Sequence, residues 1–248
     1  MRSFYAVVPL ALALRAAALY EDWHFGNMFA VGPATNNAQI TKATYSLVPP
    51  AIPCGTVQEK QNDAPWLSIW VGISASMSDQ AADLFQPLLN WSPDQEAQAC
   101  PATTQEWCVA ASTYHHTGQV QQPYITVPNG SKLDFTITVD DKKITQQVSI
   151  GGRQVSEQSD DKSINPTFLY SSNECYLGTC GTVAGYSWDK LTIHLSEADP
   201  NFGNTLNLMN ATSSGFTTAD QGKTWYAESI KINEDYFYSD GSRKECSA

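Results

Sequence analysis

Carboxylates are the most numerous side chains in this sequence that can take part in acid–base chemistry. The 248 residues include 25 Asp and Glu but only four His. Two neighbouring carboxylates hydrolyse glycosidic bonds in many enzymes, often from one face of a single strand. No ExDxE-like pattern occurs here, and the glutamates that come into question are scattered along the chain: Glu157, Glu174, Glu197 and Glu228. The spacing of the acidic residues alone therefore predicts no glycosidase pair.

The histidines and hydroxyl groups form no catalytic motif. The sequence lacks GxSxG, P-loop, GxGxxG, HExxH and EF-hand patterns. His115 and His116 are adjacent, so on a strand they would point to opposite faces and make a poor metal clamp. His194 alternates with apolar neighbours and is expected on the exposed face of its strand, and His24 stands alone. We therefore expect no metal ion and no cofactor.

The cysteines and the N-terminus predict a secreted protein. Residues 1–18 combine Arg2, an apolar stretch at 6–14 and small residues at 16–18, which is typical of a signal peptide. A short buried helix is the alternative interpretation. No other run of about 18 apolar residues occurs, so no transmembrane helix is expected. The mature chain, 19–248, is predicted to be one extracellular domain.

Six cysteines behind a signal peptide indicate disulfides in an oxidising compartment. Local spacing favours Cys100–Cys108 and Cys175–Cys180, which leaves Cys54–Cys246 as a long-range bridge. No CxxC pair supports a zinc site instead. Three glycosylation sequons fit the same compartment and begin at Asn90, Asn129 and Asn210.

The charge balance limits the partners. The net charge is −11 and only 16% of residues are charged. Nucleic acid and anionic membranes need a basic surface, so neither is an expected partner. A peptide or small-molecule substrate remains.

Short strands must position any site on this chain. Apolar and β-branched runs bounded by turn residues recur every 8–12 residues, which predicts an all-β sandwich or barrel. The expected strands are residues 41–48, 66–73, 109–114, 124–127, 132–139, 144–150, 191–195 and 225–232. The one helix-like pattern, residues 79–89, is interrupted by Pro87. The polar stretch 156–163 is expected to be a solvated loop.

The order of these segments resembles the fungal glutamic peptidases, the eqolisins. Residues 70–73 (WVGI) match a strand of that family residue for residue, and residues 84–86 (LFQ) resemble the Leu-Gln that carries its catalytic glutamine. Glu174, counted back from Trp188, falls where the family has its catalytic glutamate. Weaker likenesses lie at residues 27–30, 43–49, 128–139 and 185–195.

The resemblance implies a fold and an activity. The fold would be a concanavalin A-like, two-sheet antiparallel β-sandwich. The activity would be that of a secreted acid endopeptidase in which Glu174 activates water and the Gln86 amide stabilises the oxyanion. Such a base must stay ionised at acid pH, so nearby hydrogen-bond donors are expected to hold its pKa near the working pH. The aromatic residues expected to line the cleft are Trp70, Trp107 and Tyr114.

The chain departs from the family pattern next to these positions. Ser74 follows the WVGI strand where the family has Asp, and Pro87 follows the glutamine where the family has a small residue. Two alternatives therefore stay open for a peptidase-fold protein without proteolysis. One is a fungal biosynthetic enzyme acting on a small hydrophobic substrate, and the other is a module that binds peptide or glycan.

Overall fold

The computed structural model describes residues 23–58, 64–79 and 81–246. The predicted signal peptide, residues 1–18, lies outside these residues. The described part consists of β-strands and short 3-10 helices, among them η2 (Glu96–Gln98) and η3 (Phe202–Thr205). It contains no helix long and apolar enough to cross a membrane.

One of the two large sheets, here called sheet A, has eleven antiparallel strands. Its continuous path runs β10-β7-β6-β4-β14-β2-β17, with β1 on β14 and with β5, β8 and β9 at the end of β4. The bounds are β1 (Trp23–Phe25), β2 (Met28–Val31), β4 (Trp66–Ser74), β5 (Leu84–Phe85), β6 (Leu88–Trp91), β7 (Trp107–Ala110), β8 (Ser112–His115), β9 (Gly118–Gln121), β10 (Ile125–Val127), β14 (Phe168–Tyr176) and β17 (Asn207–Met209).

The second large sheet, sheet B, has seven antiparallel strands in the order β13-β12-β11-β3-β16-β19-β18. The bounds are β3 (Ile40–Leu47), β11 (Leu133–Val139), β12 (Lys143–Ile150), β13 (Arg153–Asp161), β16 (Tyr186–Leu195), β18 (Ala211–Ser213) and β19 (Thr224–Ile232). A small separate ladder joins β15 (Gly181–Val183) to β20 (Asp235–Phe237).

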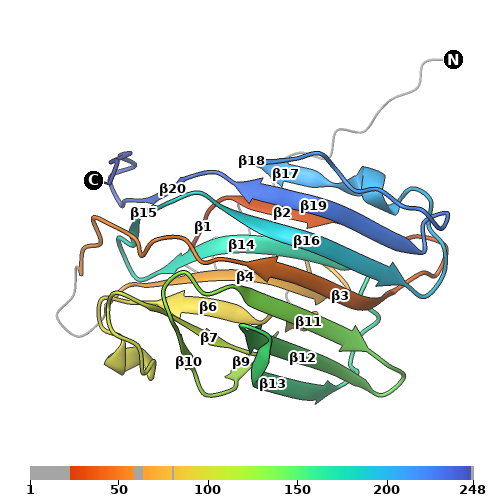
Figure 1. Cartoon of the computed structure of the whole chain (residues 1–248), viewed down its shortest axis with the longest axis horizontal. Helices are drawn as coiled ribbons and strands as arrows, with labels where there is room; N and C mark the ends of the chain where they lie inside the picture. The colour runs from red at the N-terminus through yellow and green to blue at the C-terminus, as the bar shows by residue number, and fades with distance from the viewer. Residues whose placement is uncertain (1–22, 59–63, 80, 247–248) are drawn as a thin grey trace, which may run out of the picture.

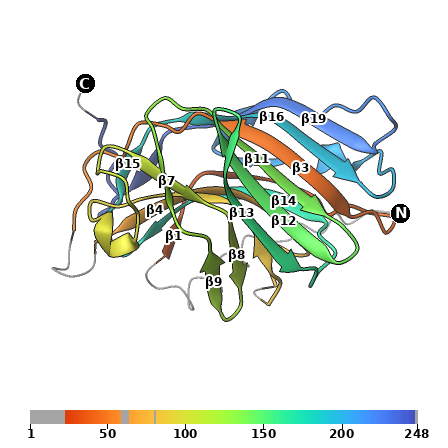
Figure 2. The ribbon, with the colours of Figure 1, turned by 60° about the horizontal axis from the view of Figure 1, so that its bottom comes forward.

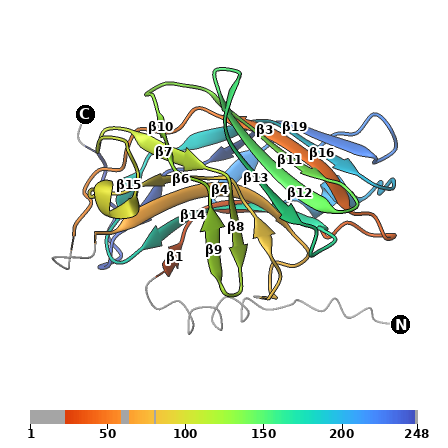
Figure 3. The same ribbon diagram turned by 90° about the horizontal axis from the view of Figure 1, so that it is seen from below.

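The two sheets pack face to face around one main core. In Figure 1 sheet B lies in front of sheet A, and in Figure 3 sheet B lies above it. Apolar side chains from both inner faces fill the space between them, including Ile69 and Phe85 from sheet A and Phe135 and Trp188 from sheet B. The prediction of a concanavalin A-like, two-sheet antiparallel sandwich is confirmed.

Strand β4 shows how sheet A separates its two faces. Leu67, Ile69, Val71 and Ile73 belong to the core between the sheets. The alternate residues point to the opposite side, because side chains alternate along a strand. We call that side, which faces away from sheet B, the open face. The β8–β9 hairpin projects from sheet A on this side, as Figures 2 and 3 show.

Two sequence predictions are wrong. In the segment 79–89, the described residues, 79 and 81–89, form no helix: they contain β5 and the start of β6, separated at Gln86 and Pro87. Pro87 cannot donate a ladder hydrogen bond, so the strand is interrupted there. Residues 156–163 are not a solvated loop, because most of them belong to β13. Ser156 and Gln158 are polar but buried. Ser156 Oγ accepts from the backbone N–H of Ala111, between β7 and β8, and Gln158 Nε2 donates to Thr113 Oγ1 of β8.

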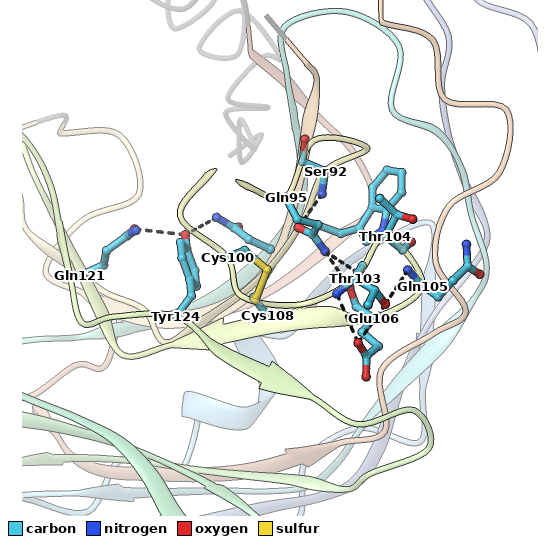
Figure 4. Close-up of a disulfide and its surroundings, with 12 residues drawn as sticks. Ser92, Gln95, Cys100, Thr103, Thr104, Gln105, Glu106, Cys108, Gln121 and Tyr124 are labelled. Carbon is cyan, nitrogen blue, oxygen red and sulfur yellow. Dashed lines mark hydrogen bonds between the residues drawn. A yellow bond between two sulfur atoms is a disulfide. The ribbon is translucent and has the colours of Figure 1, made fainter. Parts of the chain in front are cut away.

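The three predicted disulfides are confirmed. The pairs are Cys54–Cys246, Cys100–Cys108 and Cys175–Cys180. The first, here called the C-terminal disulfide, joins residues 192 positions apart. The second ties the loop that follows β6 to β7, and Figure 4 shows it near the Tyr124 side chain.

Candidate functional site on the open face

Glu174 lies on the open face of sheet A, near the end of β14 (Phe168–Tyr176). The register pairs it with Ser68 of β4 on one side and with Phe25 of β1 on the other. Residues that face each other across a ladder carry their side chains on the same side of the sheet. The two positions beside Glu174 on its own strand and face are Ser172 and Tyr176. None of these four neighbours is acidic, so the register gives Glu174 no second carboxylate.

The environment of Glu174 favours its protonated form. Trp70 Nε1 donates a hydrogen bond to Glu174 Oε2 at 2.8 Å, and the carboxyl is only partly exposed. Burial raises the pKa of Glu174 from 4.5 to about 7, and the Trp70 hydrogen bond offsets only part of this rise. This pKa lies above the acid working range that the resemblance implies, because one donor does not compensate for the loss of water.

Gln86 lies on the same face, where β5 gives way to β6. Its backbone N–H donates to Ser112 O at 2.9 Å. The side chain is 5% exposed, and its Oε1 has no hydrogen-bond partner among the described residues. A Cβ added to Gly72 would come within 2.9 Å of Gln86 Cβ and 2.8 Å of Phe85 O. The glycine of the WVGI strand therefore lets Gln86 pack directly against β4.

The structure brings Glu174 and Gln86 to one face but not into contact. Ile73 pairs with Phe85, which places Gln86 beside Gly72, whereas Glu174 pairs with Ser68. These two levels are four residues apart on β4, about 13 Å at about 3.3 Å per residue. Trp70 lies between these two levels on the same face, so a substrate group that contacts both Gln86 and Glu174 has to cross the Trp70 indole.

Two of the three predicted cleft aromatics lie on the open face, and one does not. Trp70 sits between the levels of Gln86 and Glu174, with its ring edge-on to Tyr170 at a centroid distance of 5.6 Å. Tyr114 packs against the small apolar cluster on this face. Trp107 points into the core instead, is 2% exposed and donates from Nε1 to Pro50 O at 2.9 Å. The prediction that Trp107 binds substrate is wrong, because its position in β7 directs the side chain toward the core between the sheets.

A hydrogen-bonded chain that the sequence did not reveal crosses the open face beside Glu174. Ser68 Oγ donates to Asn90 Oδ1 at 2.5 Å, and Asn90 Nδ2 donates to the Tyr124 hydroxyl. Tyr124 in turn donates to Gln121 Oε1 at 3.2 Å, a contact visible in Figure 4. Only the strand register could have identified this chain, because its members come from separate segments.

The same contacts affect the first sequon. Asn90 is 3% exposed, and its Nδ2 donates a hydrogen bond to the Tyr124 hydroxyl. This nitrogen is the atom to which a glycan would attach. A glycan at Asn90 is therefore incompatible with this packing. Asn129 is exposed in the turn before β11, and Asn210 is exposed although its Nδ2 donates to Asn27 Oδ1. Glycosylation at these two positions stays a prediction.

None of the histidines is a ladder partner of Glu174, and the nearest in the register, His24, pairs with Cys175. His115 Nδ1 is 2.7 Å from Asp83 Oδ1, and His194 Nδ1 is 3.3 Å from Thr224 Oγ1. His24 and His116 are exposed. Within residues 23–58, 64–79 and 81–246, no group of three or more His, Cys, Asp or Glu side chains could hold a metal ion.

Comparison with known proteins gives similarities in solved structures only. No family model matches the chain, and neither does any curated protein. A family 16 glucanase from Bacteroides ovatus has 12% identity and a TM-score of 0.36, with 84% of this chain and 78% of that chain covered. A β-glucanase from Bacillus licheniformis has 10% identity, the same coverage and a TM-score of 0.31. The galectin LEC-6 of Caenorhabditis elegans has 9% identity, 64% and 97% coverage and a TM-score of 0.29. The chemistry of the open face therefore has to be inferred from its own residues.

Proposed function

We propose that this chain is a secreted endopeptidase-like hydrolase in which Glu174 is the general acid–base group. One observation carries the proposal: Glu174 is a partly desolvated carboxyl, held by Trp70, on the open face of the sandwich. Strongly perturbed carboxyls in such positions are typical of catalytic groups. The resemblance to glutamic peptidases supplies the peptide bond as the substrate.

The proposed reaction uses one carboxyl and one amide. Because Trp70 occupies Oε2, proton transfer falls to Oε1 of Glu174. The ionised carboxylate takes a proton from water while the water oxygen attacks the peptide carbonyl. The Gln86 amide donates to the resulting oxyanion, and a single such donor contributes roughly 3 kcal/mol. Glu174 then returns the proton to the departing amine as the C–N bond breaks, which leaves an acid, an amine and the enzyme in its starting form.

The raised pKa of Glu174 sets the pH range of this reaction. A base with a pKa of about 7 is mostly protonated at pH 3. At four pH units below the pKa, about one molecule in ten thousand carries the carboxylate, and tenfold is lost for each unit. We therefore propose activity near neutral pH in place of the acid optimum that the resemblance implies.

The proposed location is extracellular. Three disulfides cross-link the described part of the chain, and such bridges persist in oxidising compartments. The exposed sequons at Asn129 and Asn210 support a glycoprotein. The fungal origin rests on the same family resemblance.

A second function is favoured by the apolar character of the open face. Trp70, Leu84, Leu88 and Tyr124 form a buried cluster beside the site. Trp23, Trp66 and Tyr176 form a second aromatic group, with ring centroids 4.5–6.2 Å apart. The second group is partly exposed, and it suits a peptidase-fold protein that converts a small hydrophobic substrate, or one that binds peptide or glycan without turnover.

Digestion of denatured casein tests the first function. The wild type, Glu174→Gln and Gln86→Ala would be compared at pH 3, 5 and 7.5, with disulfide content and circular dichroism confirming that each is folded. We expect cleavage by the wild type at pH 7.5, none by Glu174→Gln and about a hundredfold less by Gln86→Ala. A folded wild type that cleaves nothing at any pH would refute the peptidase proposal and leave the second function.

A further inference from the structure

Ser68 lies directly across the ladder from Glu174, on the same face. The register pairs these two residues, and such pairs have Cβ atoms about 5 Å apart. Ser68 is 5% exposed, so its hydroxyl has little access to water. It is therefore the nearest polar side chain on β4 that could hydrogen-bond to Oε1, the carboxyl oxygen that Trp70 does not hold.

The Ser68 hydroxyl proton is nevertheless committed elsewhere. It is donated to Asn90 Oδ1 at 2.5 Å, while Asn90 uses its own Nδ2 to donate to the Tyr124 hydroxyl. That second bond orients the Asn90 amide so that its oxygen faces Ser68. Burial raises the pKa of Tyr124, and its O–H donates onward to Gln121. All donors in the chain therefore point away from Glu174, and a hydroxyl has only one proton to donate.

We propose that Ser68 is a positioning residue: Asn90 and Tyr124 hold its hydroxyl with the donor turned away from Glu174, so that the Glu174 carboxyl keeps its proton on Oε1. Trp70 is then the donor that reaches the carboxyl, and the Ser68 hydroxyl, which donates to Asn90, gives the carboxylate nothing. A second donor would favour the carboxylate instead. The proposed acid–base role of Glu174 rests on this arrangement.

The other groups that face Glu174 do not supply a competing charge. From β4 they are Trp66 and Trp70, from β1 Phe25, and from β14 Ser172 and Tyr176. Ser172 Oγ donates to the Asn173 carbonyl at 2.7 Å. Tyr170, one step further along β14, has its pKa raised to about 12 mainly by burial and is neutral in the working range. Trp66 Nε1 has no hydrogen-bond partner among the described residues, so it adds no donor to Glu174 in this structure. Ser68 is the neighbour directly across the ladder whose orientation decides whether Glu174 gains a second donor.

The experiment is a carbon-13 NMR titration of the Glu174 carboxyl in the full mature chain, with the signal assigned by Glu174→Gln. Asn90→Leu frees the Ser68 hydroxyl to donate to Glu174, so the Glu174 pKa should fall by about one unit. The double variant Asn90→Leu/Ser68→Ala lacks that donor, so the Glu174 pKa should return to within a few tenths of the wild-type value. A folded Asn90→Leu variant that titrates like the wild type would overturn the proposal, as would a double variant that keeps the lowered pKa.

Ser68→Ala alone provides an independent test that does not disturb Asn90 and Tyr124. If Ser68 donates nothing to Glu174, the Glu174 pKa should move by no more than a few tenths. A rise of about one unit would show that Ser68 donates to the carboxylate, and would overturn the proposal. The titration needs no turnover, so it is separable from the casein assay. If the titrations give the expected shifts but casein is not cleaved, the proposed hydrolase is refuted. The role of Ser68 in holding the Glu174 proton is then still supported.

Discussion

Replacing Glu174 by Gln should change how the stability of the protein depends on pH. Burial raises the pKa of Glu174 from 4.5 to about 7, a shift of about 2.5 units. At about 1.36 kcal/mol per unit the shift corresponds to at most about 3.4 kcal/mol. The carboxyl is partly exposed and therefore partly screened, so we expect about 2–3 kcal/mol.

The sign follows from which form the folded state prefers. The folded state binds the proton on the Glu174 carboxyl more tightly than the unfolded state does. Its stabilising contribution is therefore fully present below about pH 4.5, and is lost as the pH rises through about 7. The amide in the Glu174→Gln variant does not titrate in this range. Relative to the variant, the wild type should lose about 2–3 kcal/mol of unfolding free energy between pH 4.5 and pH 8.

Urea unfolding with the disulfides intact, at several pH values, measures this difference. Other titrating groups contribute equally to both proteins and cancel. Glu197→Gln removes the same charge from an exposed position and is the matched control. Wild-type and Glu174→Gln curves that run parallel from pH 4.5 to pH 8 would refute the reasoning that Glu174 is desolvated.

Three further changes test the packing of the open face and the bridge across the fold. Trp70→Phe removes the donor to Glu174, so the Glu174 pKa should rise above 7 by about one unit in an NMR titration, and an unchanged pKa would contradict the assigned contact. Gly72→Ala places a Cβ 2.9 Å from Gln86 Cβ, so thermal unfolding should show a loss of about 1–3 kcal/mol, and wild-type stability would argue against the close approach. Replacing both cysteines of the C-terminal disulfide by serine should cost about 2–5 kcal/mol in urea unfolding, whereas an effect near zero would mean that the closing segment contributes little.

Much of the framework could be predicted from the sequence because local chemistry determines it. The strand at residues 132–139 follows a Pro-Asn-Gly turn and alternates cleanly, and the structure has β11 at Leu133–Val139. Short spacing gave two disulfides, and elimination gave the third. Prediction failed where side-chain polarity was misleading: β13 is polar at most positions, yet Ser156 and Gln158 are buried and form hydrogen bonds across the sandwich.

The site itself depends on register, which a single sequence does not encode locally. Trp70 and Trp107 look alike as aromatic residues in apolar strands, but one faces the open side and the other the core. Ser68 and Asn90 are 22 residues apart and meet only because β4 pairs with β6. The desolvation of Glu174 likewise arises from neighbours on other strands, so its direction could not be predicted.

The most direct test of the proposed function is the pH dependence of kcat/KM for a fluorogenic peptide, measured from pH 3 to pH 9 with the wild type and Glu174→Gln. We predict a rate that rises with a midpoint near pH 7 in the wild type and is absent in the variant, because the ionised Glu174 is the base. Faster cleavage at pH 3 than at pH 7, or cleavage that survives in Glu174→Gln, would contradict the role given to Glu174.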